Sequence, residues 1–145
     1  MSDFLPWKKI YSVDVKEIDE QHKDMFRIVG RLHDAIKYNV EYKTIKNVLI
    51  ELIDYTQKHF GTEEKYFTSF NYPQGTRHKE EHAEFVSKIL EFTKEFREGI
   101  NQKLSQDVLN FLQNWIIKHI LGTDMMYKGK FKSSHKEFKT LNHVD

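Results

Sequence analysis

Apolar residues recur every three or four positions along most of this chain, which is the spacing that gives a helix one buried face. Four such runs follow one another, over residues 18–36, 45–67, 85–96 and 108–120. Turn-forming residues separate the runs, and no stretch alternates polar and apolar positions as a half-buried strand does. The pattern therefore predicts an all-α protein, most simply an up-down-up-down antiparallel four-helix bundle.

The ends of these helices can also be predicted, because particular residues stop or begin a helix. The segment FNYPQG, residues 70–75, holds a proline and a glycine and should end the second helix. Gly99 is expected to terminate the third helix, and Ser105 to cap the start of the fourth. Gly122 lies where the fourth helix should stop or become distorted.

The chain has 145 residues, which is enough for one domain with a substantial core. The helical pattern weakens near its end, so we expect a bundle domain over 1–130 and a lysine-rich C-terminal extension over 131–145. A net charge of +1 gives no electrostatic reason to expect a nucleic acid or an anionic membrane as partner. Because no apolar run has the length of a signal peptide or a membrane span, we expect an unexported, soluble, cytoplasmic protein. We also expect it to be a monomer.

Histidine is unusually frequent, with eight copies in a chain that has no cysteine. Counting along the apolar stripes places at least one histidine on the buried face of every predicted helix. A carboxylate, Glu63, lies one turn after a histidine on the same face. The inward histidines are His22, His59, His78, His82 and His119.

A single histidine on an apolar stripe is usually a hydrogen-bonded residue of the core or its boundary. We interpret His33 in this way, and we expect His135 and His143 to be exposed in the extension. For the five inward histidines this interpretation does not hold, because the cost of burying so many polar groups adds up. Burying an unpaired polar group costs roughly 1–3 kcal/mol, so five histidines together with two carboxylates, Glu63 and Asp124, rival a total stability of roughly 5–15 kcal/mol. A metal centre would compensate them, because neutral imidazole and carboxylate are natural metal ligands.

The stretch HILGTD, residues 119–124, puts His119 and Asp124 five positions apart. On a regular α-helix five steps turn the chain by about 140°, so the two side chains would diverge. A break or a widened turn near Gly122 would bring both to one target. Five histidines and two carboxylates are too many for one zinc ion, but they suit two metal ions held together by bridging carboxylates.

This set of residues resembles that of the hemerythrins, most closely their single-domain bacterial type. The matching segments are IDEQH around His22, HFGTEE from His59, HKEEH from His78 and WIIKHILGTD from Trp115. Trp7 also matches an early tryptophan of that family. The resemblance covers most of the chain and fills all seven ligand positions at the family's spacing.

The resemblance implies a non-haem di-iron centre in the core of the bundle, with two oxygen-bridged iron ions that bind O2 reversibly. It also implies that one iron is held by three histidines and the other by two, so that the second iron keeps an open position. The first iron would use His78, His82 and His119, the second His22 and His59, and the bridges would be Glu63 and Asp124.

An apolar pocket beside such a centre would exclude water and slow autoxidation. The residues that match the family's pocket are also explained by ordinary core packing. The chain departs from the family at Asp14, where relatives often carry glycine, and in its lysine-rich end. The pocket positions are Met25, Phe60, Trp115, Ile116 and Ile120.

Enzymes provide the competing interpretations. Ferritin-like di-iron oxidases use four glutamates with Glu-x-x-His pairs, whereas no glutamate stands three positions before any of the five inward histidines. The zinc-protease motif H-E-x-x-H is not matched, because Lys79 occupies the position of its glutamate. Peroxidase or nitric-oxide reductase activity at the same centre stays open, as does an O2-sensing module. We expect a binding protein rather than an enzyme, for O2 carriage, storage or delivery, with an oxygen-consuming enzyme as a candidate partner.

Overall fold

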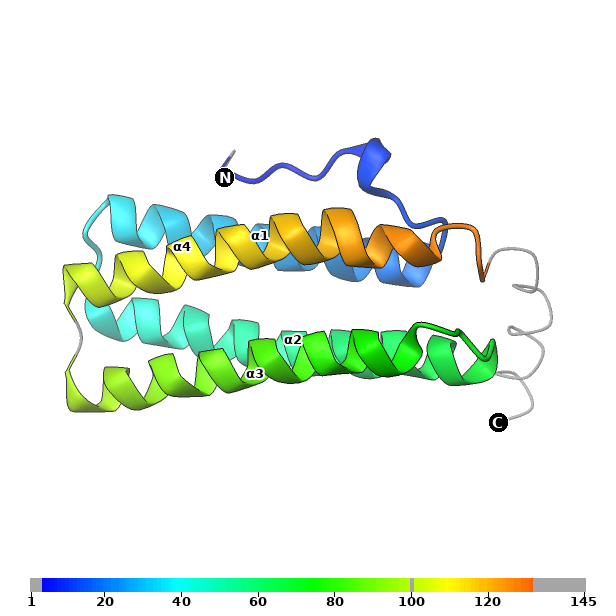
Figure 1. Cartoon of the computed structure of the whole chain (residues 1–145). Coiled ribbons are helices and arrows are strands. Elements are labelled where there is room, and N and C mark those ends of the chain that lie inside the picture. Colours follow the sequence, from blue (N-terminus) through cyan, green and yellow to red (C-terminus); the bar gives the residue numbers. More distant parts are fainter. Residues whose placement is uncertain (1–3, 100, 132–145) are drawn as a thin grey trace.

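The computed structural model describes residues 4–99 and 101–131, which form a bundle of four long helices (Figure 1). Successive helices run in opposite directions, and each packs against its two neighbours. The predicted all-α, up-down-up-down fold is therefore confirmed. Within the described ranges there is no strand, and no helix is long and apolar enough to cross a membrane. The helices are α1 (Lys16–Lys37), α2 (Tyr42–Ser69), α3 (Gly75–Glu98) and α4 (Gln102–Lys118).

Between α3 and α4, the predicted end of the third helix is correct and the predicted start of the fourth helix is wrong. Gly99 ends α3 with a φ of 147°, a conformation that favours glycine, and its N–H donates to the carbonyl of Glu95. The predicted cap at Ser105 is wrong, because α4 begins earlier and Ser105 is buried within it. The cap is Asn101, whose side-chain oxygen accepts a hydrogen bond of 2.8 Å from the N–H of Leu104. No helix-breaking residue separates the two positions, so the helix extends back to the earlier capping residue.

The apolar core is divided into two clusters along the bundle. The larger one joins all four helices and contains residues such as Leu32, Leu52 and Leu112. The smaller one is aromatic and is built around Tyr66 and Phe67. The inward histidines lie between these clusters, since the residues on either side of them along each helix belong to one cluster or the other. The fold therefore surrounds a polar centre with apolar residues at both ends.

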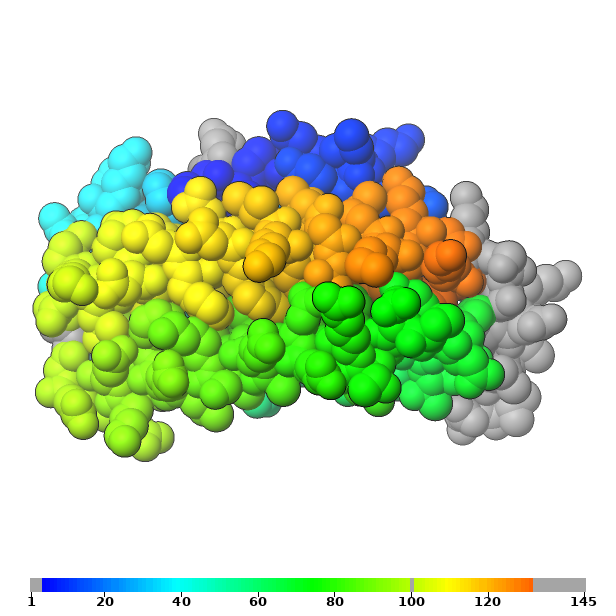
Figure 2. Space-filling view, in the orientation of Figure 1, coloured from blue at the N-terminus to red at the C-terminus, as the bar shows by residue number. Residues whose placement is uncertain are grey.

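The N-terminal segment lies along the bundle instead of extending away from it (Figure 2). It contains one 3-10 turn, η1 (Lys9–Tyr11). The ring of Phe4 stacks on His33 with 4.0 Å between centroids, which supports the interpretation of His33 as a boundary residue. Asp14, where glycine is frequent in the resembling family, has a φ of 65°. This left-handed conformation is one that glycine adopts without cost.

The chain continues past α4 in two short irregular helices and then closes one end of the bundle. They are η2 (His119–Thr123), a π-helix, and η3 (Asp124–Tyr127), a 3-10 helix. Phe131 follows them and is buried against the ring of Tyr66. The division at residue 130 stays a prediction, and the expected exposure of His135 and His143 falls outside the described residues.

Candidate metal centre

Seven side chains from α1, α2, α3, η2 and η3 meet in the gap between the two apolar clusters. Each is at most 2% exposed, although all seven are polar or charged. The sequence predicted inward positions for six of them and expected Asp124 to join them through a break or a widened turn near Gly122. The structure brings all seven together. They are His22, His59, Glu63, His78, His82, His119 and Asp124.

Their ligand atoms form two groups, and the atoms within each group lie no more than 4.8 Å apart. Both groups contain Glu63, so the carboxylate lies where they meet. This arrangement suits two neighbouring cations that share a carboxylate. The first group is Glu63, His78, His82 and His119, and the second is His22, His59, Glu63 and Asp124.

Asp124 contacts the histidines of both groups through different oxygens. Its Oδ1 lies 2.8 Å from Nε2 of His78 and 3.0 Å from Nε2 of His119. Its Oδ2 lies 3.0 Å from Nε2 of His22, which belongs to the other group. A carboxylate in this position could place one oxygen on each of two metal ions.

Glu63 is arranged differently from the two-oxygen bridge expected for it. Its Oε1 lies 3.0 Å from Nε2 of His82 and 3.3 Å from Nε2 of His59, so this one oxygen faces both groups. Its Oε2 accepts a hydrogen bond from the phenol of Tyr127. Tyr127 is fully buried. The sequence analysis did not predict its role, because no neighbouring residue in the sequence indicates that its hydroxyl would contact a carboxylate.

The π-helix explains the five-residue interval between His119 and Asp124. The N–H of Asp124 donates to the carbonyl of His119, which is the i to i+5 hydrogen bond of a π-turn. The wider turn returns the chain to the same face after five residues instead of four. Of the two predicted alternatives near Gly122, the helix widens before it stops, and both side chains reach the centre.

Many of the buried atoms that face the centre lie within 2.8–3.3 Å of one another but make no hydrogen bond of good geometry. Nε2 of His22, His59 and His82 and both oxygens of Asp124 are of this kind. Nε2 of His78 also lies only 3.1 Å from Nε2 of His119, so two ring nitrogens of the same type face each other. Buried polar atoms without partners are costly, and cations among them would satisfy these atoms together. The donor set of imidazole nitrogens and carboxylate oxygens therefore fits divalent metal ions such as iron.

The electrostatics of the centre favour the ionised forms of the two carboxylates. Burial alone would raise the pKa of Asp124, but the surrounding imidazoles, His119 above all, hold it well below its usual value. Burial and the charge of Asp124 oppose ionisation of Glu63 as well, yet His59 and His82 lower its pKa overall. Burial raises the pKa of the Tyr127 phenol far above its ordinary value, so it remains a hydrogen-bond donor. Both carboxylates are thus negatively charged, which is the form in which a carboxylate binds a metal ion.

Two histidines of the centre differ in their affinity for a proton. Burial lowers the pKa of His59, which leaves it as the neutral imidazole that a metal requires. Burial also opposes protonation of His119, but the charge of Asp124 prevails and raises the pKa of His119 to about 9. A metal ion bound by His119 would therefore have to displace a proton from it.

The outer nitrogens of three histidines are held by polar partners that sequence reasoning also missed. Nδ1 of His59 lies 2.8 Å from the side-chain oxygen of Gln21. Nδ1 of His119 lies 2.8 Å from Glu81, and Nδ1 of His82 lies 3.1 Å from Glu64. Such partners fix the orientation of metal-binding imidazoles. The available signal was their position, since each of the three partners is adjacent in sequence to a residue of the centre.

The five predicted pocket residues belong to α1, α2, α4 and η2, the elements that also carry residues of the centre or adjoin them. Met25, Ile116 and Ile120 are at most 1% exposed. The ring of Phe60 stacks on His82 with 3.7 Å between centroids and 5° between planes. Trp115 stacks on His119 with a centroid distance of 4.0 Å. These rings cover two imidazoles with apolar surface, and the assignment of the five residues to a pocket stays a prediction.

Comparisons with known proteins agree with this geometry. The family model described as the hemerythrin HHE cation binding domain matches residues 13–131. The bacteriohemerythrin of Clostridium acetobutylicum is 32% identical over 124 residues, which cover 83% of this chain and 96% of that protein. A hemerythrin-like protein of Naegleria gruberi is 32% identical over 123 residues, covering 85% of this chain and 90% of its own.

A solved structure of a wild-type hemerythrin superposes on this fold with a TM-score of 0.78 at 28% identity. The match covers 89% of this chain and 98% of that one. The family model spans α1 to η3 and includes every residue of the centre. From the fold, the centre and these matches together, we conclude that the chain belongs to the hemerythrin family.

Proposed function

We propose that the protein binds two iron ions at this centre and takes up O2 there reversibly. The observation that carries the proposal is the division of the buried ligand atoms into two groups that share Glu63. Membership of the hemerythrin family supports a function of the non-haem iron, oxygen-binding type. The bound iron pair would supply the coordination position and the electrons that O2 uptake needs.

The proposed ligand assignment follows the two groups. Three imidazoles hold one iron, and two imidazoles hold the other, which leaves that second ion with fewer protein ligands and room for O2. The position of Asp124 between His78 and His22 supports its role as a bridge. The proposed ligands are His78, His82 and His119 for the first ion, His22 and His59 for the second, and Glu63 and Asp124 between them.

The protein surroundings have two tasks in this proposal. Gln21, Glu64 and Glu81 hold the imidazole rings in orientation from outside. The proposed pocket residues keep water away from the centre, and the exclusion of water slows irreversible oxidation. The proposed pocket residues are Met25, Phe60, Trp115, Ile116 and Ile120.

A carrier, storage or delivery role is favoured over an enzymatic one by the donor set. Five imidazoles and two carboxylates make a centre that is poorer in negative charge than the carboxylate-rich sites of ferritin-like proteins. We propose that the protein binds O2 and releases it unchanged, and that an oxygen-consuming enzyme is the recipient.

The test is an oxygen titration of the reduced, iron-loaded protein, followed by absorption spectroscopy and metal analysis. We expect two iron ions per chain and an absorption band that appears with O2 and disappears on degassing. One zinc ion per chain would contradict the proposed centre. A band that never reverses, combined with turnover of peroxide or nitric oxide, would replace the carrier with an enzyme.

A further inference from the structure

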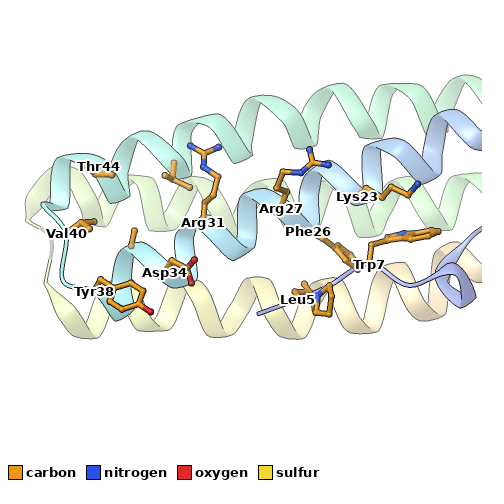
Figure 3. Close-up of a pocket in the computed structure, with 13 residues that line it drawn as sticks. Leu5, Trp7, Lys23, Phe26, Arg27, Arg31, Asp34, Tyr38, Val40 and Thr44 are labelled. Atoms are coloured by element: carbon orange, nitrogen blue, oxygen red, sulfur yellow. The ribbon is translucent and has the colours of Figure 1, made fainter. Parts of the chain in front are cut away.

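A hollow of about 760 Å³ lies on the outer side of α1, between the N-terminal segment and the beginning of α2 (Figure 3). We call it the α1 trough. None of the seven residues of the metal centre lines it. Its volume falls within the range of about 300–1,000 Å³ that is typical of small-molecule sites. The trough is therefore large enough to hold an organic ligand of its own.

One side of the α1 trough is lined by a row of basic side chains. Lys23, Arg27 and Arg31 are spaced four residues apart and so lie on one face of α1 (Figure 3). Their side chains are between 35% and 59% exposed. Asp34 is the single carboxylate among the lining residues. Among the lining residues themselves, three side chains are cationic and one is anionic.

Each basic side chain of the row already contacts a carboxylate, but these contacts are weak. Exposed ion pairs contribute little to stability, so a ligand that offers a better-placed anion can displace them at little cost. Arginine is especially suited to this exchange, because its planar guanidinium can bind a carboxylate through two parallel hydrogen bonds. The present partners of Lys23, Arg27 and Arg31 are Glu20, Asp24 and Glu51 respectively.

The rest of the α1 trough is apolar. Leu5 and Trp7 come from the N-terminal segment, Phe26 from α1 and Val48 from α2. Trp7 joins the two kinds of lining, since the ammonium of Lys23 lies 4.6 Å from its ring centroid. A ligand that fits this lining needs an apolar body along the wall and an anionic group that reaches the basic row.

We propose that the α1 trough binds a small amphipathic carboxylate of the medium-chain fatty-acid class. The apolar chain lies against Phe26 and Val48, and the carboxylate binds to Arg27 and Arg31. The proposal is independent of iron and O2 binding, because it uses none of the residues of the metal centre.

The test is isothermal calorimetry of the full iron-loaded chain with decanoate, kept below the concentration at which it forms micelles. We expect one binding site, and weaker binding of the uncharged analogue decan-1-ol. Replacing both arginines, Arg27→Gln with Arg31→Gln, should weaken decanoate binding about tenfold, because charge-assisted hydrogen bonds are lost. The matched control is Lys46→Gln, which removes an exposed cation of α2 outside the trough and should leave the affinity unchanged.

Two further variants separate binding in the α1 trough from general attraction to a positive surface. Thr44→Trp adds a bulky ring at an exposed lining position and should abolish binding without disturbing the core. Asp34→Asn should tighten binding, because it removes the one negative charge of the lining. Metal analysis of every variant should show an unchanged iron content.

Several results would overturn the proposal. They are no heat of binding with decanoate, equal affinity for decan-1-ol, or equal loss in the arginine variant and in Lys46→Gln. Sedimentation with anionic phospholipid vesicles, without binding of free decanoate, would assign the basic row to a membrane surface instead.

Discussion

The phenol of Tyr127 donates a hydrogen bond to Oε2 of Glu63, across 64 positions of the chain. This contact leaves only Oε1 of the carboxylate facing the histidines of both groups. It joins the aromatic cluster, to which Tyr127 belongs, to the polar centre beside it. Tyr127 therefore acts as a positioning residue for a carboxylate that both groups share.

Removing the Tyr127 hydroxyl is expected to weaken metal binding. In Tyr127→Phe the buried Oε2 of Glu63 loses its donor, so the carboxylate is no longer held in one orientation. Loss of such an outer partner typically lowers metal affinity about 10–100-fold. Metal titration under anaerobic conditions measures the effect. Tyr72→Phe, which removes a hydroxyl from a neighbouring ring of the same cluster, is the control and should keep the wild-type affinity.

The contact between Glu81 and His119 leads to a second prediction. Glu81→Gln retains the size of the side chain but removes the charge that faces Nδ1 of His119. We expect a loss of iron affinity of about tenfold, because the imidazole becomes a weaker ligand. Iron content after dialysis against a chelator gives the measurement. Glu80→Gln, at the exposed neighbouring position, should behave as the wild type, and equal losses in both variants would contradict the role of Glu81.

The division of the histidines into inward and peripheral ones can be tested directly. His119→Ala should lose iron and destabilise the bundle, because its partner Asp124 stays buried without it. His33→Ala should retain both iron ions, since His33 stacks on Phe4 and lies 3.1 Å from Asp34, and it is not part of either ligand group. Metal analysis and thermal unfolding of the two variants would reveal the difference. A similar iron loss in both would show that the division is wrong.

Two leucines that differ in burial should differ in their contribution to stability. Leu112 is completely buried in the larger cluster, and Leu112→Ala should lower the free energy of unfolding by about 2–5 kcal/mol. Leu90 on α3 is 56% exposed, and Leu90→Ala should change it by no more than about 0.5 kcal/mol. Urea denaturation of both variants gives the comparison.

The environment of Tyr55 predicts that the stability of the fold depends on pH in the alkaline range. Burial raises its pKa, and the hydrogen bond from its phenol to Asp24, 2.9 Å long, raises the pKa further. Because the pKa is higher in the folded than in the unfolded chain, this stabilisation is complete below pH about 10 and is lost at higher pH. Tyr55→Phe should therefore reduce the fall in melting temperature above that pH. The exposed Tyr38 provides the control variant, Tyr38→Phe, which should follow the wild type.

Helical periodicity was sufficient to predict the helices and the inward set, because residues such as His59 and Glu63 share a helix face by spacing alone. The interval from His119 to Asp124 even indicated a disturbed helix. The start of α4 was misplaced because Asn101 and Ser105 are both good caps, and the sequence does not distinguish them. Tyr127 could not be predicted as a partner of Glu63, because their contact depends on how the end of the chain packs across the bundle.

The widened turn at η2 determines more than the direction of one aspartate. It also changes the angular position of the residues that follow it, which include Asp124 and Tyr127. The same backbone irregularity therefore completes the polar centre and brings Tyr127 into the aromatic cluster that closes this end of the bundle. A change that restored a regular α-helix at η2 would therefore disturb both the polar centre and the aromatic cluster.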